Sequence, residues 1–142
     1  VRELKSDAIE KSSLLSAVQE LINDANGLGD RLVSFSIHGN VTELDEDEEQ
    51  TVYRLVRESL TNSLRHSGGA DIEVVFSYAS HLLNVMIADN GQGCRTIRKH
   101  FGLDHIEEQI GLLGGSVRFE TAEGDGFRTK ASIPLRKGGF RS

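Results

Sequence analysis

One short motif in this sequence places a carboxylate at the end of a strand, with two glycines beside it. The apolar run from Leu82 to Ala88 leads directly into Asp89-Asn90-Gly91-Gln92-Gly93. A carboxylate at the end of a buried strand is costly unless it meets a hydrogen-bond donor, and an exocyclic amine is one such donor. Glycine lets the backbone approach a ligand closely. Asn-Gly pairs are also typical of ordinary turns, so this motif alone predicts either a turn or a ligand site.

A second set of polar residues recurs at intervals of four. Glu58, Asn62 and His66 have this spacing, and Arg65 precedes His66. Each four-residue step rotates a helix by about 40°, so the three side chains share one stripe beside the apolar face. Carboxylate and amide oxygens on adjacent turns suit Mg²⁺, and an arginine suits a phosphate group. The same spacing also fits a solvated helix face, so both interpretations stay open.

The composition excludes several classes of function. With 142 residues, the chain is long enough for one domain with a sizeable core. Its net charge of −6 leaves no basic stripe for nucleic acid, and no apolar run approaches the roughly 18 residues of a membrane span. The single cysteine, Cys94, forms no disulfide within the chain, which agrees with a reducing cytoplasm. Because the first residue is Val1 and not methionine, we expect a fragment of a longer protein, whose other parts can include a membrane anchor or sensor.

Apolar periodicity predicts the elements that position these motifs. Helical spacing is expected over residues 1–24, 47–66 and 103–113, and strand alternation over 32–37, 72–78, 82–88 and a hairpin across 117–133. Hairpins join most of the strands. This order favours an α+β fold with helices on one face of a mixed, mostly antiparallel sheet.

Six acidic residues lie between Glu43 and Glu49. They resemble a site for a metal or a basic partner. Acids in a first helical turn also oppose the positive end of the helix dipole, and we favour this second interpretation. Thr42 or Asp45 would then cap the long helix.

Three motifs in order resemble the nucleotide-binding boxes of the Bergerat-fold ATPases, the group that includes gyrase and the histidine kinases. Residues 58–66 resemble the N box, residues 89–93 the G1 box and residues 102–115 the G2 region. Residues 53–62, followed by Leu64-Arg65-His66, are similar to the catalytic ATP-binding domain of bacterial sensor histidine kinases of the NarL/DesK type. The resemblance covers about residues 30–135 and implies a Bergerat-type α/β sandwich.

This resemblance implies how the G1 and G2 residues would bind ATP. Asp89 would accept a hydrogen bond from the adenine amino group, while Gly91 and Gly93 let the chain pass close to the base. Residues 94–101 would form the ATP lid, a polar segment without an apolar period that we expect to be mobile. Gly102 and Leu103 would turn the amide end of the next helix toward the phosphates.

The resemblance also implies roles for the polar stripe of the long helix. Asn62 would hold Mg²⁺, Arg65 would meet a phosphate and His66 would place its ring against the nucleotide. Glu58 would be the catalytic residue or a second ligand of magnesium.

Two positions depart from the pattern of the kinase subfamily. His100 stands where a lid glycine is usual, and this substitution would change the flexibility of the lid. Phe127 stands where a serine or threonine is usual near the adenine site, so we expect the affinity for nucleotide to be low.

The resemblance implies the donation of the ATP γ-phosphate to a histidine on a separate dimerisation domain, for relay to a response regulator. None of the five histidines lies in a phosphoacceptor motif. We expect residues 1–26 to be the tail of the connection from that missing domain, residues 27–135 to be the ATP-binding domain and residues 136–142 to be a flexible tail. The parent protein would be a cytoplasmic homodimer or a membrane-anchored one, and this domain itself would contact no membrane.

Two other functions fit the same boxes. A Bergerat-fold Ser/Thr kinase that acts on anti-sigma partners shares them, although the residues around Glu58 argue against it. A degenerate module that binds nucleotide or only a partner is the other alternative, because positions 100 and 127 are altered.

Overall fold

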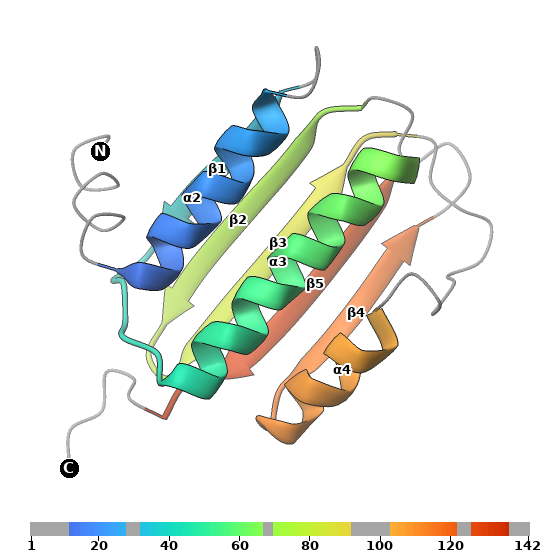
Figure 1. Ribbon diagram of the computed structural model, residues 1–142. Coiled ribbons are helices and arrows are strands. Elements are labelled where there is room, and N and C mark those ends of the chain that lie inside the picture. Colours follow the sequence, from blue (N-terminus) through green and yellow to red (C-terminus); the bar gives the residue numbers. More distant parts are fainter. Residues whose placement is uncertain (1–11, 28–31, 67–69, 92–102, 122–125, 137–142) are drawn as a thin grey trace.

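A five-stranded sheet, covered on one face by three helices, forms the described part of the chain (Figure 1). The structure is a computed structural model, and it describes residues 12–27, 32–66, 70–91, 103–121 and 126–136. The predicted α+β class is confirmed.

The sheet is mixed but mostly antiparallel, as the sequence predicted. Its strands are β1 (Val33–His38), β2 (Ile72–Ala79), β3 (Leu82–Asp89), β4 (Ser116–Thr121) and β5 (Phe127–Pro134). Their order across the sheet is β1-β2-β3-β5-β4, with β1 and β2 parallel and all other neighbours antiparallel. The long connection through a helix allows the parallel pair, whereas the tight turn at Ser80 and His81 makes β2 and β3 a hairpin.

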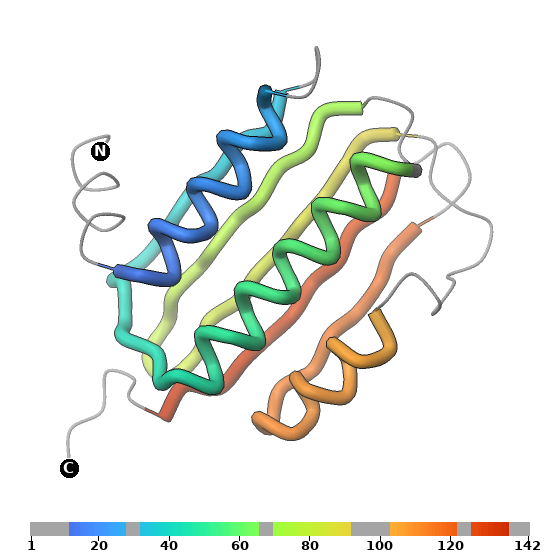
Figure 2. Tube along the Cα trace, viewed as in Figure 1, coloured from blue at the N-terminus to red at the C-terminus, as the bar shows by residue number. Residues whose placement is uncertain are grey.

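The three helices lie side by side on the same face of the sheet. They are α2 (Ser13–Asn26), α3 (Glu46–His66) and α4 (Leu103–Leu112). Helix α2 packs on β1 and on α3, while α3 crosses β2, β3 and β5, and α4 packs beside β4 (Figure 2). The hydroxyl of Ser12 begins α2 by accepting a hydrogen bond of 3.1 Å from the backbone N–H of Leu15. None of the helices in the described ranges is long and apolar enough to cross a membrane.

The acidic residues at positions 45–49 form the start of α3. Asp45 Oδ1 accepts a hydrogen bond of 2.9 Å from the N–H of Glu48, and Glu48 Oε1 accepts one of 2.9 Å from the N–H of Asp45. This reciprocal capping box confirms the interpretation of the acids as a helix start, with Asp45 as the cap. Glu48 is only 1% exposed, and it also accepts a hydrogen bond of 3.0 Å from the N–H of Arg136. The start of α3 is therefore tied to the chain just after β5.

The core lies between the sheet and the helices. On β3, the buried side chains are Leu83, Val85 and Ile87, which alternate with more exposed ones. Helix α2 contributes five buried residues: Leu14, Leu15, Val18, Ile22 and Ala25. Helix α2 thus shares one core with the strands and with the other two described helices, while the expected domain division at residue 26 stays a prediction.

Candidate functional site

Asp89 is the last residue of β3, and its side chain faces α3. The residue as a whole is 8% exposed. Its Oδ2 accepts a hydrogen bond of 2.7 Å from the hydroxyl of Ser63, and its Oδ1 accepts one of 3.0 Å from the N–H of Gly91. The chain itself thus supplies two of the donors that a buried carboxylate needs. Each carboxylate oxygen has a second lone pair, so Asp89 can accept one more donor from a ligand.

The last turns of α3 carry two buried polar atoms without a partner. Asn62 Nδ2 and Ser59 Oγ are fully buried, and neither has a hydrogen-bond partner among the residues that the structure describes. A buried polar group left unpaired costs about 1–3 kcal/mol, so each requires an explanation such as a bound water or ligand. Asn62 directly precedes Ser63 on α3, so it lies on the same helical turn as the residue that donates to Asp89.

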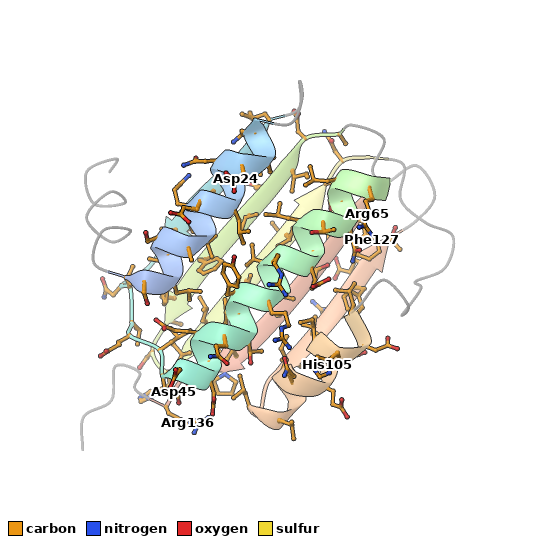
Figure 3. All side chains as sticks on the ribbon, in the orientation of Figure 1. Asp24, Asp45, Arg65, His105, Phe127 and Arg136 are labelled. Carbon is orange, nitrogen blue, oxygen red and sulfur yellow. The ribbon has the colours of Figure 1, made fainter. Side chains whose placement is uncertain are left out.

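The other polar residues expected on this stripe reach solvent more freely. The side chain of Glu58 is 32% exposed, and its Oε2 lies 3.5 Å from Nη2 of Arg57. Arg65 is exposed in the last turn of α3, above the start of β5, where Phe127 lies (Figure 3). His66 is the last residue of α3, and its side chain is outside the described part of the structure.

The backbone positions expected to surround a ligand are described only in part. Gly91 donates to Asp89 and follows β3 by two residues. Gly93, Gly102 and the expected lid at residues 94–101 lie outside the described residues. Leu103 begins α4, and its side chain is 2% exposed, so only its backbone can face a ligand.

Two residues support Asp89 in ways that the sequence did not reveal. Ser63 lies within residues 58–66, the stretch that resembles the N box, but the sequence did not indicate its hydrogen bond to Asp89. Gly126 has a φ of +81°, and a Cβ at this position would lie 2.2 Å from the carbonyl oxygen of Asp89. Only a glycine allows β5 to begin so close to the end of β3. The glycine-rich turn before β5 was the only sequence signal for this contact.

Among the described residues, no three His, Cys, Asp or Glu side chains group closely enough to hold a metal ion by themselves. A metal site of another kind uses one or two protein oxygens, and waters and oxygens of a bound ligand fill the remaining positions. Mg²⁺ is bound in this way when it accompanies nucleotide phosphates.

Curated proteins of similar sequence are sensor histidine kinases. LnrJ of Bacillus subtilis is 27% identical over 135 residues, which are 95% of this chain and 33% of LnrJ. YxjM of the same organism is 34% identical over 86 residues, which are 61% of this chain and 21% of YxjM. This chain therefore covers a third or less of the length of these relatives. No protein-family model matches it.

Solved structures of similar fold are also histidine kinases. The histidine kinase domain of the blue-light activated kinase EL346 from Erythrobacter litoralis superposes with a TM-score of 0.64 at 18% identity, over 85% of this chain and 64% of that one. The kinase AdeS from Acinetobacter baumannii superposes with a TM-score of 0.69 at 14% identity, over 87% of this chain and 64% of that one. At this level of identity the likeness establishes the fold.

Proposed function

Because this chain is an ATPase-like catalytic domain of the sensor histidine kinase type, we propose that it binds ATP and donates the γ-phosphate to a histidine. The relatives are of the NarL/DesK type, as the sequence motifs indicated. We place the acceptor histidine on a separate dimerisation domain of a homodimeric parent protein, which then passes the phosphate to a response regulator. The site would work in the cytoplasm, where ATP is available.

The observation that carries this proposal is the buried, doubly held carboxylate of Asp89. Its hydrogen bonds from Ser63 and Gly91 fix its orientation and leave lone pairs open to a further donor. An adenine amino group supplies such a donor, whereas the carbonyl oxygen at the same position of guanine would be repelled. Asp89 thereby selects the base, and Gly91 and Gly93 allow the backbone to lie close to it.

Asn62 and Arg65 support the binding of the phosphates. A phosphate oxygen of a bound ligand would give a partner to the buried Nδ2 of Asn62, which has none among the described residues. Its oxygen, with Glu58 as a possible second ligand, fits Mg²⁺, which would neutralise phosphate charge when bound. Arg65 is exposed and carries a fixed positive charge at the end of α3. We also assign His66, Gly102 and the backbone of Leu103 to the nucleotide site.

The residues of this chain would act mostly by positioning the γ-phosphate for attack in line with its leaving group. Glu58 is the carboxylate on the same stripe as Asn62, one turn earlier in α3, and it is exposed enough to reach an incoming imidazole. We propose that it orients the attacking histidine.

The first experiment is calorimetric titration of Mg-ATP and Mg-ADP into this chain. We expect Asp89→Asn to lower the affinity at least about tenfold, because the loss of a hydrogen bond to a charged group is worth about 1.5–3 kcal/mol. Asn62→Ala should lower the affinity for Mg-ATP and leave the fold intact. Asp24→Asn makes the same change on α2, away from the site (Figure 3), and serves as the matched control. Gln50→Ala is the control for Asn62→Ala, because Gln50 is an exposed residue of the same helix.

The outcomes separate the possible functions. Binding that depends on Asp89 and Asn62, but not on Asp24 and Gln50, supports the ATP site. If the wild-type chain binds no nucleotide at millimolar concentration, the proposed function is wrong. The alternative, a module that binds only a partner, is then favoured. Phosphate transfer is then tested by adding a dimerisation domain from the parent protein together with radiolabelled ATP.

A further inference from the structure

We propose that the rings of Phe127 and Phe119 form an aromatic wall beside Asp89, and that this wall contacts the face of the bound nucleobase. The inference rests on the proposed function, because the proposed function places the adenine base beside Asp89. It differs from the expectation that Phe127 only weakens binding through the absence of a hydroxyl group.

The register of the sheet places Phe127 next to Asp89. In the β3–β5 pair, Asp89 is opposite Phe127, and Ile87 is opposite Thr129. Thr129, Ala131 and Ile133 are buried under the helices, and strand alternation puts Phe127 on the same face. Side chains of residues directly opposite on antiparallel strands have Cβ atoms about 4.5–5.5 Å apart. The ring of Phe127 is therefore a nearest neighbour of the Asp89 carboxylate.

Phe119 extends this apolar surface from β4. Its ring centroid lies 6.2 Å from that of Phe127, with an angle of 45° between the ring planes. Both residues are only partly buried, whereas Thr129, which is opposite Phe119 and two residues from Phe127 on β5, is 2% exposed. Both residues thus keep some accessible surface near the end of the sheet that carries Asp89.

Two hydroxyl groups near the wall are engaged in hydrogen bonds within the chain. The hydroxyl of Thr121 donates to the carbonyl oxygen of Gly126 at 2.7 Å, and the hydroxyl of Ser63 donates to Asp89. A ligand here meets one carboxylate in a defined orientation and two aromatic rings. This combination fits a planar heteroaromatic ring with an amino group at its edge, which adenine provides. The carboxylate selects the edge of the base, and the rings contribute affinity through contact with its face.

The test compares nucleotide with a ligand that lacks the base. In Phe127→Leu we expect the affinity for Mg-ATP to fall about 5-fold or more, because stacking of a base on an aromatic side chain is worth about 1–3 kcal/mol. The affinity for magnesium tripolyphosphate should stay within twofold. Phe35→Leu is the matched control: Phe35 is a buried residue of β1, so this variant loses stability but keeps its affinity for ATP.

A second measurement uses the wild-type chain and does not depend on the folding of a variant. In protein labelled on phenylalanine, we expect nuclear Overhauser effects between ring protons of Phe127 and the H2 or H8 protons of bound adenine. The Phe127 signals are assigned by their change in Phe127→Tyr.

Three results are decisive. Loss of ATP affinity in Phe127→Leu, together with contacts to adenine protons, establishes the wall. ATP binding that depends on Asp89 but not on Phe127, without such contacts, overturns the wall and leaves the proposed function standing. Absence of ATP binding by the wild-type chain overturns both.

Discussion

Asp89 is the residue on which the proposed nucleotide site depends, and its surroundings explain why it tolerates burial. The two hydrogen bonds to its carboxylate come from a helix and from the backbone of the following turn. The sequence predicted that Asp89 needs a hydrogen-bond donor, because the apolar run before it indicates a buried strand. It did not reveal Ser63, because a partner 26 residues away depends on how α3 crosses the sheet. The role of Gly126 was hidden for the same reason.

Tyr78 makes the stability of the fold sensitive to alkaline pH. Burial, and to a lesser degree the charge of Glu49, raise the pKa of the Tyr78 hydroxyl well above its usual value of 10.0. Above about pH 10, the unfolded chain releases a proton that the folded chain keeps. The free energy of unfolding therefore falls as the pH rises, with a slope that approaches about 1.4 kcal/mol per pH unit.

Urea unfolding between pH 8 and pH 11 measures this slope. We expect Tyr78→Phe to remove this contribution, and Tyr53→Phe, which changes the other tyrosine, to keep it. An unchanged slope in Tyr78→Phe would show that other groups cause the pH dependence.

At the scale of elements, the helices and strands follow from local patterns. The predicted long helix at residues 47–66 begins one residue earlier, at Glu46, because Asp45 and Glu48 cap it. The hairpin of β2 and β3 was predicted from its short turn. The parallel pairing of β1 with β2 was not predicted. Alternation of apolar and polar residues shows which face of a strand is buried, but not which strand lies beside it.

Gly126 joins two elements and provides a test of the turn before β5. We expect Gly126→Ala to lower the free energy of unfolding by about 1–3 kcal/mol or more, because φ is +81° and the new Cβ would meet the carbonyl oxygen of Asp89. The same change should weaken ATP binding, since it displaces Asp89.

Gly111→Ala is the matched control for that change. Gly111 lies within α4, and a Cβ there would have no neighbour within 4 Å. Alanine at this helical position should raise the free energy of unfolding by about 0.5–1 kcal/mol. Thermal unfolding of both variants gives the comparison, and equal losses in the two would contradict our account of Gly126.

At the scale of the whole molecule, α2 belongs to the same core as the strands. Its large buried side chains are Leu14, Leu15, Val18 and Ile22. Burial of each contributes about 1.5–3 kcal/mol, and the net stability of a domain is about 5–15 kcal/mol. We therefore predict that a chain beginning at residue 27 loses cooperative unfolding, whereas a chain that begins at Ser12 and keeps the cap of α2 retains it.

Circular dichroism during thermal unfolding distinguishes the two shortened chains. A cooperative transition in the chain that begins at residue 27 would support the expected domain division at residue 26. A transition confined to the longer chain would move the boundary of the folding unit to the start of α2 or earlier.

Hydrogen bonds connect both ends of α3 to the sheet or to the residue just after β5. At its first turn, Glu48 binds the N–H of Arg136 after β5, and at its last turn, Ser63 binds Asp89 at the end of β3. A helix held at only one end frays from the other, but α3 has no such free end. We therefore expect amide protons along the middle of α3 to exchange with solvent only when the whole domain opens, and to exchange more slowly than those of α2 and α4.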